Sequence, residues 1–465
     1  MQYVIDMMNG TRCRLSITAT ASDVKSFMDT ALRDLKKEAP KGFTLAGAAK
    51  DDPLLRRVAE RAVSHMASVF SSQALREADK HPVARPWPEA EGGIALPAYG
   101  QEFKFVMLAD VLPDIPFPDD FSALALEVRE PDIPPAEVFR SIERLMRPLV
   151  KLEAVTDRRL PANGDVMDVS VEGDIDGMPV PGLKKQEMSL PLDSFAVERD
   201  EGTAKTDLSR VVEKVARGLH VGEEGEGVML CPENYPLPSL RGKPVRLKVT
   251  LRSLRRREVP SLTDETAVKL GYPDAGTLKA KAYTTVMNRC VLSRREEANE
   301  ALFRMLPGLE DVEVPESLQR IFLAEYMADM KSFLRNTGVE NDPRMKEVLA
   351  SSREEGQRMA EENAKRHVYL LAYAYKTGIS IPEKDVDEQV RMLAVQAGKP
   401  VDEFRKGMEE SDMLDSLEER MMAGKAMEKI YAAVKKVVVD AEGKPVPVPN
   451  VVESQMERKT KRYIG

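Results

Sequence analysis

Apolar residues recur with two different periods, and these divide the chain into regions. In "CRLSITAT", residues 13–20, Leu15 and Ile17 fall on one face, which predicts a strand. Apolar residues then recur at helical spacing over residues 24–35, and Ser22 is the expected N-cap. Asp52-Pro53 predicts the start of a second, longer helix. We therefore expect an α+β domain in which strands surround a helical hairpin.

Period-two alternation returns in the middle of the chain. In "VRLKVTL", residues 245–251, four aliphatic residues alternate with polar ones, which predicts a strand with one buried face. Gly173, Asp176-Gly177 and Gly242 mark turns. A proline-started helix within residues 132–152 leads into this region. The pattern predicts a β-rich middle domain.

The C-terminal half consists of helical patterns separated by glycine. Gly338, Gly378 and Gly398 each follow a helical run and are expected to end it. No a/d heptad is sustained, which favours antiparallel helical arms over one long coiled coil. The expected fold class is a multidomain α+β protein. Its expected parts are an α+β domain (1–115), a linker with a connecting helix (116–152), a β-rich domain (153–256), a helical domain (257–439) and a basic, flexible tail (440–465).

Composition narrows the classes of function. The 465 residues carry a net charge of −8, which argues against wholesale nucleic-acid binding. No stretch approaches about 18 consecutive apolar residues, and the N-terminus lacks the pattern of a secretory signal, so no membrane association is expected. The three cysteines and four histidines show no metal-ligand spacing, so no metal site is expected. The 24 methionines favour adaptable apolar surfaces in the C-terminal third.

Four stretches, taken in order, resemble the trigger factor family of bacterial ribosome-associated chaperones. They are the first helical hairpin with Gly42-Phe43 at its tip, "VEGDIDGMPV", "GLHVGEE" followed by "CPENYPLPSLRGKPVRLKV", and "EVPESLQ". The resemblance extends over essentially the whole chain. It implies a ribosome-binding-like N-terminal domain, an FKBP-type peptidyl-prolyl isomerase domain in the middle, and an all-α C-terminal chaperone domain with helical arms. It implies no cofactor.

The resemblance also identifies the positions of an isomerase pocket. Such enzymes bind the twisted peptide bond better than the planar one, within aromatic walls that exclude water. The corresponding positions here are Val171, Asp176, Val180, Val212, Tyr235 and Leu247. Three valines and a leucine stand where the family has or often has aromatic rings, whereas the tyrosine is kept. We expect weak or lost isomerase activity, and retained activity stays open as an alternative.

The loop "PKGFTLAGAAKDDP", residues 40–53, lies at the position of the family's ribosome-docking loop, Gly-Phe-Arg-x-Gly-Lys-x-Pro. Gly42 and Phe43 match it, whereas Thr44 replaces the arginine. Lys41 and Lys50 flank the loop and are expected to compensate in part. The resemblance implies docking on the large ribosomal subunit near the peptide exit, in weakened form, with Phe43 as an exposed apolar residue.

A chaperone for unfolded chains needs apolar surface rimmed by charge. The helical half offers candidates for contact with clients, although each one alone is more often a core residue at its helical spacing. These candidates are Phe322, Tyr326, Met330, Phe333, Tyr369, Tyr373, Met392 and Met421.

The preferred interpretation is a cytoplasmic chaperone for nascent and unfolded polypeptides. It works without ATP, because the chain has no GxxxxGK[ST] phosphate-binding loop. The expected partners are the ribosome and unfolded chains, and a homodimer stays open. One alternative is an active peptidyl-prolyl isomerase. The second is a ribosome-independent, dedicated chaperone or scaffold.

Overall fold

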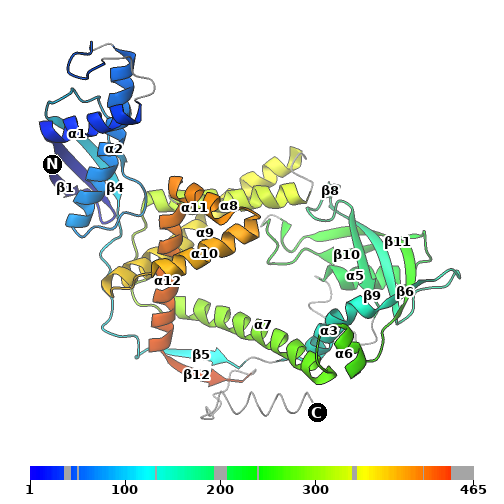
Figure 1. Cartoon of the computed structure of the whole chain (residues 1–465). Coiled ribbons are helices and arrows are strands. Elements are labelled where there is room, and N and C mark those ends of the chain that lie inside the picture. Colours follow the sequence, from blue (N-terminus) through cyan, green and yellow to red (C-terminus); the bar gives the residue numbers. More distant parts are fainter. Residues whose placement is uncertain are drawn as a thin grey trace. The chain divides into compact units, whose positions relative to one another are not determined.

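The chain divides into two compact units, each assembled from segments far apart in the sequence (Figure 1). This computed structural model describes residues 1–35, 43–49, 52–130, 133–192, 207–237, 240–337, 343–411 and 413–440. The first unit contains Met1–Asp120, Leu306–Ala324 and Gln357–Ala432. The second contains Phe121–Met305, Glu325–Gly356 and Ala433–Gly465. The expected multidomain α+β class is confirmed. The proposed tail, beyond Asp440, lies outside the described residues.

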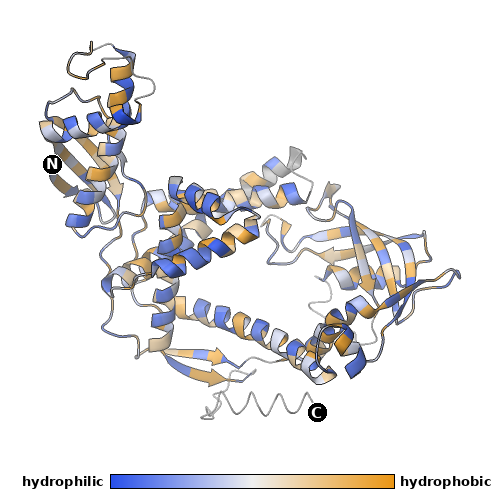
Figure 2. Ribbon diagram, in the orientation of Figure 1, coloured by the Kyte–Doolittle hydropathy of each residue, from blue (hydrophilic) through white to orange (hydrophobic). Residues whose placement is uncertain are grey.

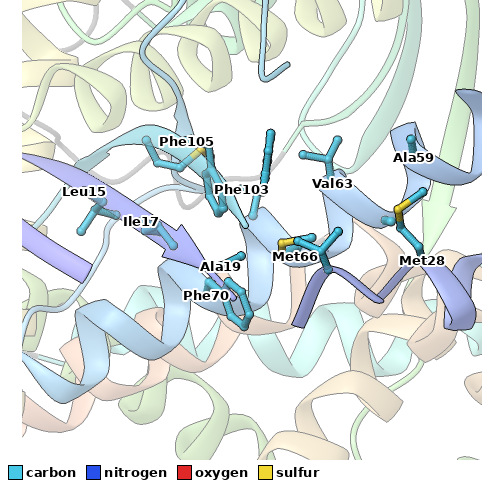
Figure 3. Packing of buried hydrophobic residues seen from close by; sticks show 14 of the residues in the cluster. Leu15, Ile17, Ala19, Met28, Ala59, Val63, Met66, Phe70, Phe103 and Phe105 are labelled. Carbon is cyan, nitrogen blue, oxygen red and sulfur yellow. The ribbon is translucent and has the colours of Figure 1, made fainter. Parts of the chain in front are cut away.

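An antiparallel four-stranded sheet organises the N-terminal domain. Its order is β1 (Gln2–Met7), β2 (Arg12–Ala19), β4 (Phe103–Asp110) and β3 (Trp87–Pro88). The helices α1 (Ala21–Asp34) and α2 (Pro53–Glu77) share one apolar cluster with it. Figure 3 shows this packing, with labelled side chains from both the strands and the helices. The alternation of β2 is thus explained, since every second residue is buried.

Capping residues decide where the two helices begin. Thr20, not Ser22, is the N-cap of α1, so that expectation was wrong. The Thr20 hydroxyl accepts from the Asp23 backbone N–H, and the Asp23 carboxylate accepts from the Thr20 N–H, which closes a capping box. Asp52 caps α2, with Pro53 at its first position, as expected.

Five helices lie wholly or partly in the C-terminal segments of the first unit. They are α8 (Glu316–Asn336), α9 (Pro343–Lys376), α10 (Glu383–Ala397), α11 (Val401–Glu410) and α12 (Met413–Ala433). Gly378 and Gly398 follow α9 and α10 with φ of 66° each, which fits their expected role as helix ends. Gly338 lies outside the described residues.

A buried carboxylate joins the start of α8 to the N-terminal sheet. Asp110 accepts hydrogen bonds from Arg12 Nε at 2.7 Å and from the Ser317 backbone N–H at 2.9 Å. Burial alone would raise the pKa of this carboxyl, but the bonds from Arg12 and Ser317 lower it below its usual range. Asp110 therefore stays ionised and satisfies the helix end.

The β-rich domain is a second, antiparallel sheet. It follows the order β10 (Glu224–Leu230), β11 (Pro244–Glu258), β7 (Asp165–Ile175) and β8 (Met178–Pro179). β6 (Lys151–Ala154) also pairs with β11, and β9 (Gln186–Pro191) pairs with β7. α5 (Leu208–Ala216) crosses β10 at its glycines, because a Cβ at Gly225 or Gly227 would lie 2.8 Å from Val215.

The remaining elements of the second unit are helices and a short parallel pair. α3 (Pro135–Met146) and the 3-10 turn η1 (Arg147–Leu149) precede the sheet, and α6 (Asp264–Lys269) and α7 (Ala275–Phe303) follow it. β12 (Lys435–Val439) pairs in parallel with β5 (Ala125–Arg129). The expectation that residues 257–439 are helical throughout was therefore wrong at their end. The β-branched run "VVV" finds a strand partner more than 300 residues away.

Across the described ranges, no helix is both long and apolar enough to cross a membrane. The same ranges hold no cluster of three or more potential metal-ligating side chains.

Candidate functional sites

The positions aligned with the isomerase pocket meet in the core of the β-rich domain. Val171 lies on β7, Leu247 on β11 and Val212 on α5, and Val180 follows β8. All four belong to one apolar cluster, and none is more than 1% exposed. Aliphatic side chains therefore fill the space at these positions by packing against one another.

Asp176 has a structural role in the turn between β7 and β8. Its φ is 51° and that of Gly177 is 77°, the pair of positive values that a tight type I′ hairpin turn requires. The Asp174 carboxylate accepts from the Gly177 backbone N–H at 2.8 Å and pairs with Arg246 at 3.0 Å. The Asp-Gly sequence thus sets a turn, and Asp176 itself is exposed.

Tyr235, the aromatic residue that is kept, is fixed by contacts to both of its ends. Its hydroxyl donates to the Pro181 carbonyl at 2.7 Å. Its ring meets the Phe333 ring edge-to-face, with centroids 5.9 Å apart. Burial raises the pKa of the phenol, so it stays neutral and remains a donor.

A helical tip covers this side of the β-rich domain. The tip consists of the end of α8 and the start of α9, described over residues 325–337 and 343–356, which belong to the same unit as the sheet. Met330 and Leu334 are buried members of the β-domain cluster, and Tyr326, Phe333 and Leu349 pack against it. The pocket region is therefore covered by side chains of the chain itself.

Arg241 ties Tyr235 to this tip. Its Nε donates to the Tyr235 carbonyl at 2.8 Å, and one of its terminal nitrogens pairs with the Glu355 carboxylate at 2.8 Å. Nearby, burial raises the pKa of the Cys231 thiol to about 11, so it is an unreactive core residue. Sequence reasoning missed Arg241 and Glu355 because they are 114 positions apart.

The loop after α1 contributes its apolar side chains to the core. Phe43 packs against the N-terminal cluster as a half-buried residue, and Leu45 is buried within that cluster. The expectation that Phe43 is an exposed apolar residue is therefore corrected, because the cluster between α1 and α2 takes up its ring. Thr44 is exposed. Lys41, Gly42 and Lys50 lie outside the described residues.

The eight client-contact candidates are divided between the two units. Tyr326, Met330 and Phe333 belong to the helical tip in the second unit. The other five lie in the first unit, where their surroundings differ. Each unit is therefore considered by itself.

Three of those five are packed among other rings. The Phe117 ring makes edge-to-face contacts with the rings of Tyr369 and Tyr373, at centroid distances of 4.9 Å and 5.3 Å. The Tyr369 hydroxyl donates to the Pro307 carbonyl. Phe322 meets the His367 ring at 5.8 Å. Burial lowers the pKa of His367 to about 4, so it stays neutral. These side chains stabilise the helical core.

The two remaining candidates lie on α10 and α12. Met392 is 55% exposed and Met421 is half-buried. Sequence reasoning missed three exposed apolar residues on α10, α11 and α12, namely Val395, Val401 and Met413. Figure 2 shows apolar and polar residues interspersed along these helices. A helical pattern could have found them, since each lies off the buried stripe of its helix.

Comparison with known proteins identifies the family. The model of the bacterial trigger factor protein matches residues 1–145, and the model of the trigger factor C-terminus matches residues 277–432. The chain belongs to the trigger factor family. The β-rich domain falls between the two matched ranges. The expected membership in the trigger factor family is thus confirmed. Membership in this family supports a chaperone role in protein folding.

Individual trigger factors are similar over most of their length. Those of two Nitratidesulfovibrio vulgaris strains, DP4 and Miyazaki F, are 22% and 24% identical, covering 95% and 94% of this chain and 99% of each relative. The trigger factor of Aquifex aeolicus is 26% identical over 81% of this chain and 75% of its own. A solved structure of the trigger factor chaperone covers 93% of this chain and 99% of its own, with 18% identity and a TM-score of 0.36.

Proposed function

We propose that this trigger factor relative binds nascent and unfolded polypeptides without ATP, through exposed apolar side chains of its helices. The observation that carries the proposal is the exposed group on α10 to α12, where Met392, Val395 and Met413 are each more than half exposed. Large apolar side chains in that number on one set of helices suit a partner that brings apolar segments of its own. Charged residues between them keep the surface soluble.

An aggregation assay tests this proposal. A chemically denatured client is diluted into buffer with the protein and without nucleotide, and light scattering is followed. We expect scattering to fall as the protein reaches equimolar amounts. Unchanged scattering at a tenfold excess, with the protein folded by circular dichroism, would rule out the binding of unfolded chains.

We further propose that the isomerase activity of the β-rich domain is weak or lost. Twisting a peptide bond costs about 18–20 kcal/mol, and the aromatic walls that would lower this barrier are replaced by packed valines. The one remaining ring, on Tyr235, is engaged by Pro181 and Phe333.

The refolding rate of a small protein that is limited by proline isomerisation tests this proposal. It is measured in the presence of the wild type and of Phe333→Ala, and the two rates distinguish a lost, a covered and an active isomerase site. We expect no acceleration from either, which indicates a lost pocket. Acceleration by the variant alone would mean that the site is competent but covered. Acceleration by both would establish the alternative, an active peptidyl-prolyl isomerase.

Docking at the ribosome, near the peptide exit, is proposed in weakened form. Phe43 supports the fold of its own domain, which leaves less of the loop for a partner. Thr44 is exposed at the position where the family has arginine, and an arginine there would pair with phosphate.

Co-sedimentation with ribosomes tests this through a gain of function. Thr44→Arg should increase the pelleted fraction of the protein. Thr284→Arg, the same substitution at an exposed position of α7, should not. If wild type and Thr44→Arg both remain in the supernatant, the second alternative holds, and the protein is a ribosome-independent chaperone or scaffold.

A further inference from the structure

A groove in the second unit is lined by an unusual concentration of arginine. The cavity has a volume of about 580 Å³, within the range of ligand pockets, and lies beside α3. Five arginines reach it: Arg140, Arg144, Arg147, Arg257 and Arg289. Two glutamates, Glu137 and Glu143, are the acidic residues of its lining. The lining therefore carries three surplus positive charges in a chain whose net charge is −8.

The two glutamates already occupy three of the guanidinium groups. Glu137 pairs with Arg140 and with Arg289, both at 2.6 Å, and Glu143 pairs with Arg257 at 3.1 Å. These contacts show that the groove accommodates carboxylates, and they hold the arginine side chains in place. Planar guanidinium groups bind carboxylates through paired hydrogen bonds, with a specificity that lysine does not give.

Arg144 and Arg147 provide the open charge. Both are exposed, and among the described residues neither is paired with a carboxylate. Arg144 donates only to the Arg140 backbone carbonyl, at 3.3 Å. They lie three positions apart, at the end of α3 and the start of η1, so their side chains project from neighbouring turns. An incoming anion would therefore meet two guanidinium groups that carry no acidic partner.

Part of the lining of the groove is apolar, and this part is called its floor. Val150, Leu152, Val166 and Pro191 line it, and Leu152 is 44% exposed. An extended peptide places alternate side chains on opposite faces, so it can present apolar groups to this floor and carboxylates to the rim. A nucleic acid would lack a matching surface, because none of the described lining residues is aromatic and the two glutamates repel phosphate.

We propose that this groove binds extended acidic segments of polypeptide, whose carboxylates pair with Arg144 and Arg147 while their apolar side chains lie on the floor. The inference rests on the proposed function, since it gives the class of client segment that the β-rich side of the protein holds. The groove would be a second, charge-selective binding site, separate from the exposed apolar residues of α10 to α12.

Fluorescence anisotropy with the full chain tests the proposal. The probe is a labelled ten-residue peptide of alternating glutamate and valine, compared with the glutamine–valine peptide of the same length. We expect the acidic peptide to bind at least about tenfold more tightly, and its affinity to fall when salt rises from about 50 to about 300 mM. Equal binding of both peptides would overturn the assignment. So would tighter binding of a ten-residue oligouridylate.

Matched variants locate the site. Arg144→Ala with Arg147→Ala should weaken the acidic peptide about tenfold, whereas Arg56→Ala with Lys104→Ala, an equal loss of exposed charge elsewhere, should leave its affinity unchanged. Glu143→Gln should tighten binding severalfold, because it removes one of the two negative charges of the lining. Equal effects of the two double variants would overturn the site.

The test is separable from that of the proposed function. Suppression of aggregation of a client without acidic segments depends on the apolar helix face and should survive Arg144→Ala with Arg147→Ala. If the wild type does not suppress aggregation of this client, the chaperone proposal is refuted. Retained suppression together with absent acidic-peptide binding would refute the groove alone.

Discussion

Two apolar helix surfaces with similar sequence patterns meet different surroundings in this molecule. At the helical tip of α8 and α9, Met330 and Leu334 are 9% and 1% exposed, because they pack into the core of the β-rich domain. On α10, Met392 and Val395 are 55% and 73% exposed. Amphipathic periodicity predicts that a helix has an apolar face, but not whether another element covers it.

The difference teaches which residues can meet a client. Side chains of the tip are engaged by the chain itself and stabilise the second unit, so a client would have to displace them. Side chains of the α10 face need no displacement. The set of client-contact candidates thus separates into a covered group, with a structural role, and an exposed group, which the proposed function would use.

The largest expected effect comes from placing a charge in the covered group. Leu334→Asp buries a carboxylate among apolar side chains, and we expect a loss of about 3 kcal/mol or more in unfolding free energy. Chemical denaturation followed by circular dichroism measures it. Val395→Asp on the open face is the control and should change stability by less than about 0.5 kcal/mol. Equal losses would show that the two surfaces do not differ.

The sequence predicted local structure well and distant contacts poorly. The α2 start follows from Asp52-Pro53, and the strand alternation around Leu247 follows from burial of one face. The pairing of β5 with β12 joins residues more than 300 positions apart, and no local pattern encodes it. Helical propensity also does not reveal that a β-branched run will find a strand partner.

The candidate sites divide in the same way. Family resemblance brought Val171, Val180, Val212 and Leu247 to one place, and the structure places them in one core. It could not show that Phe333 lies over Tyr235, or that Phe43 turns into its own domain, because both depend on tertiary packing. Exposure is a property of the assembled fold.

Removing the polar connection to the tip should have an intermediate effect. Arg241→Ala deletes the bond to the Tyr235 carbonyl and the ion pair with Glu355, and we expect a loss of about 1–2 kcal/mol. Hydrogen exchange should increase at residues 325–337, the described end of α8. Arg353→Ala, an exposed arginine on the same tip, is the control. Unchanged exchange in Arg241→Ala would mean that apolar packing alone holds the covered surface.

The stability of α12, one of the helices with exposed apolar residues, is expected to depend on pH. α12 is joined to α10 by the Lys425–Asp385 pair at 3.1 Å, and it carries Glu419. Burial, with Asp415 and Glu418 nearby, raises the pKa of Glu419 to about 7. The folded state therefore binds the proton more tightly than the unfolded state, and stability falls as pH rises from about 4.5 to about 7.

Glu419→Gln tests that assignment. The variant should raise the Tm by a few degrees at pH 8, where the wild type holds a half-buried charge, and the gain should vanish near pH 5. His367, whose pKa is lowered to about 4, destabilises the fold as pH falls from about 6.5, but this contribution is common to both proteins and cancels in the comparison. A gain that is equal at both pH values would contradict the titration of Glu419.

The smallest effect on stability is expected from substitutions of the exposed apolar residues on α10, which should act on client binding directly. Met392→Ser with Val395→Ser removes two exposed apolar side chains, so unfolding free energy should stay within about 0.5 kcal/mol of the wild type. Suppression of client aggregation should fall a few-fold, because each lost contact removes apolar area that a client would bury. Lys384→Ser with Glu388→Ser, exposed polar positions on the same helix, should change neither quantity. If the apolar variant suppresses aggregation as well as the wild type does, exposure on α10 does not mark the client surface, and displacement of the covered tip becomes the better account of binding.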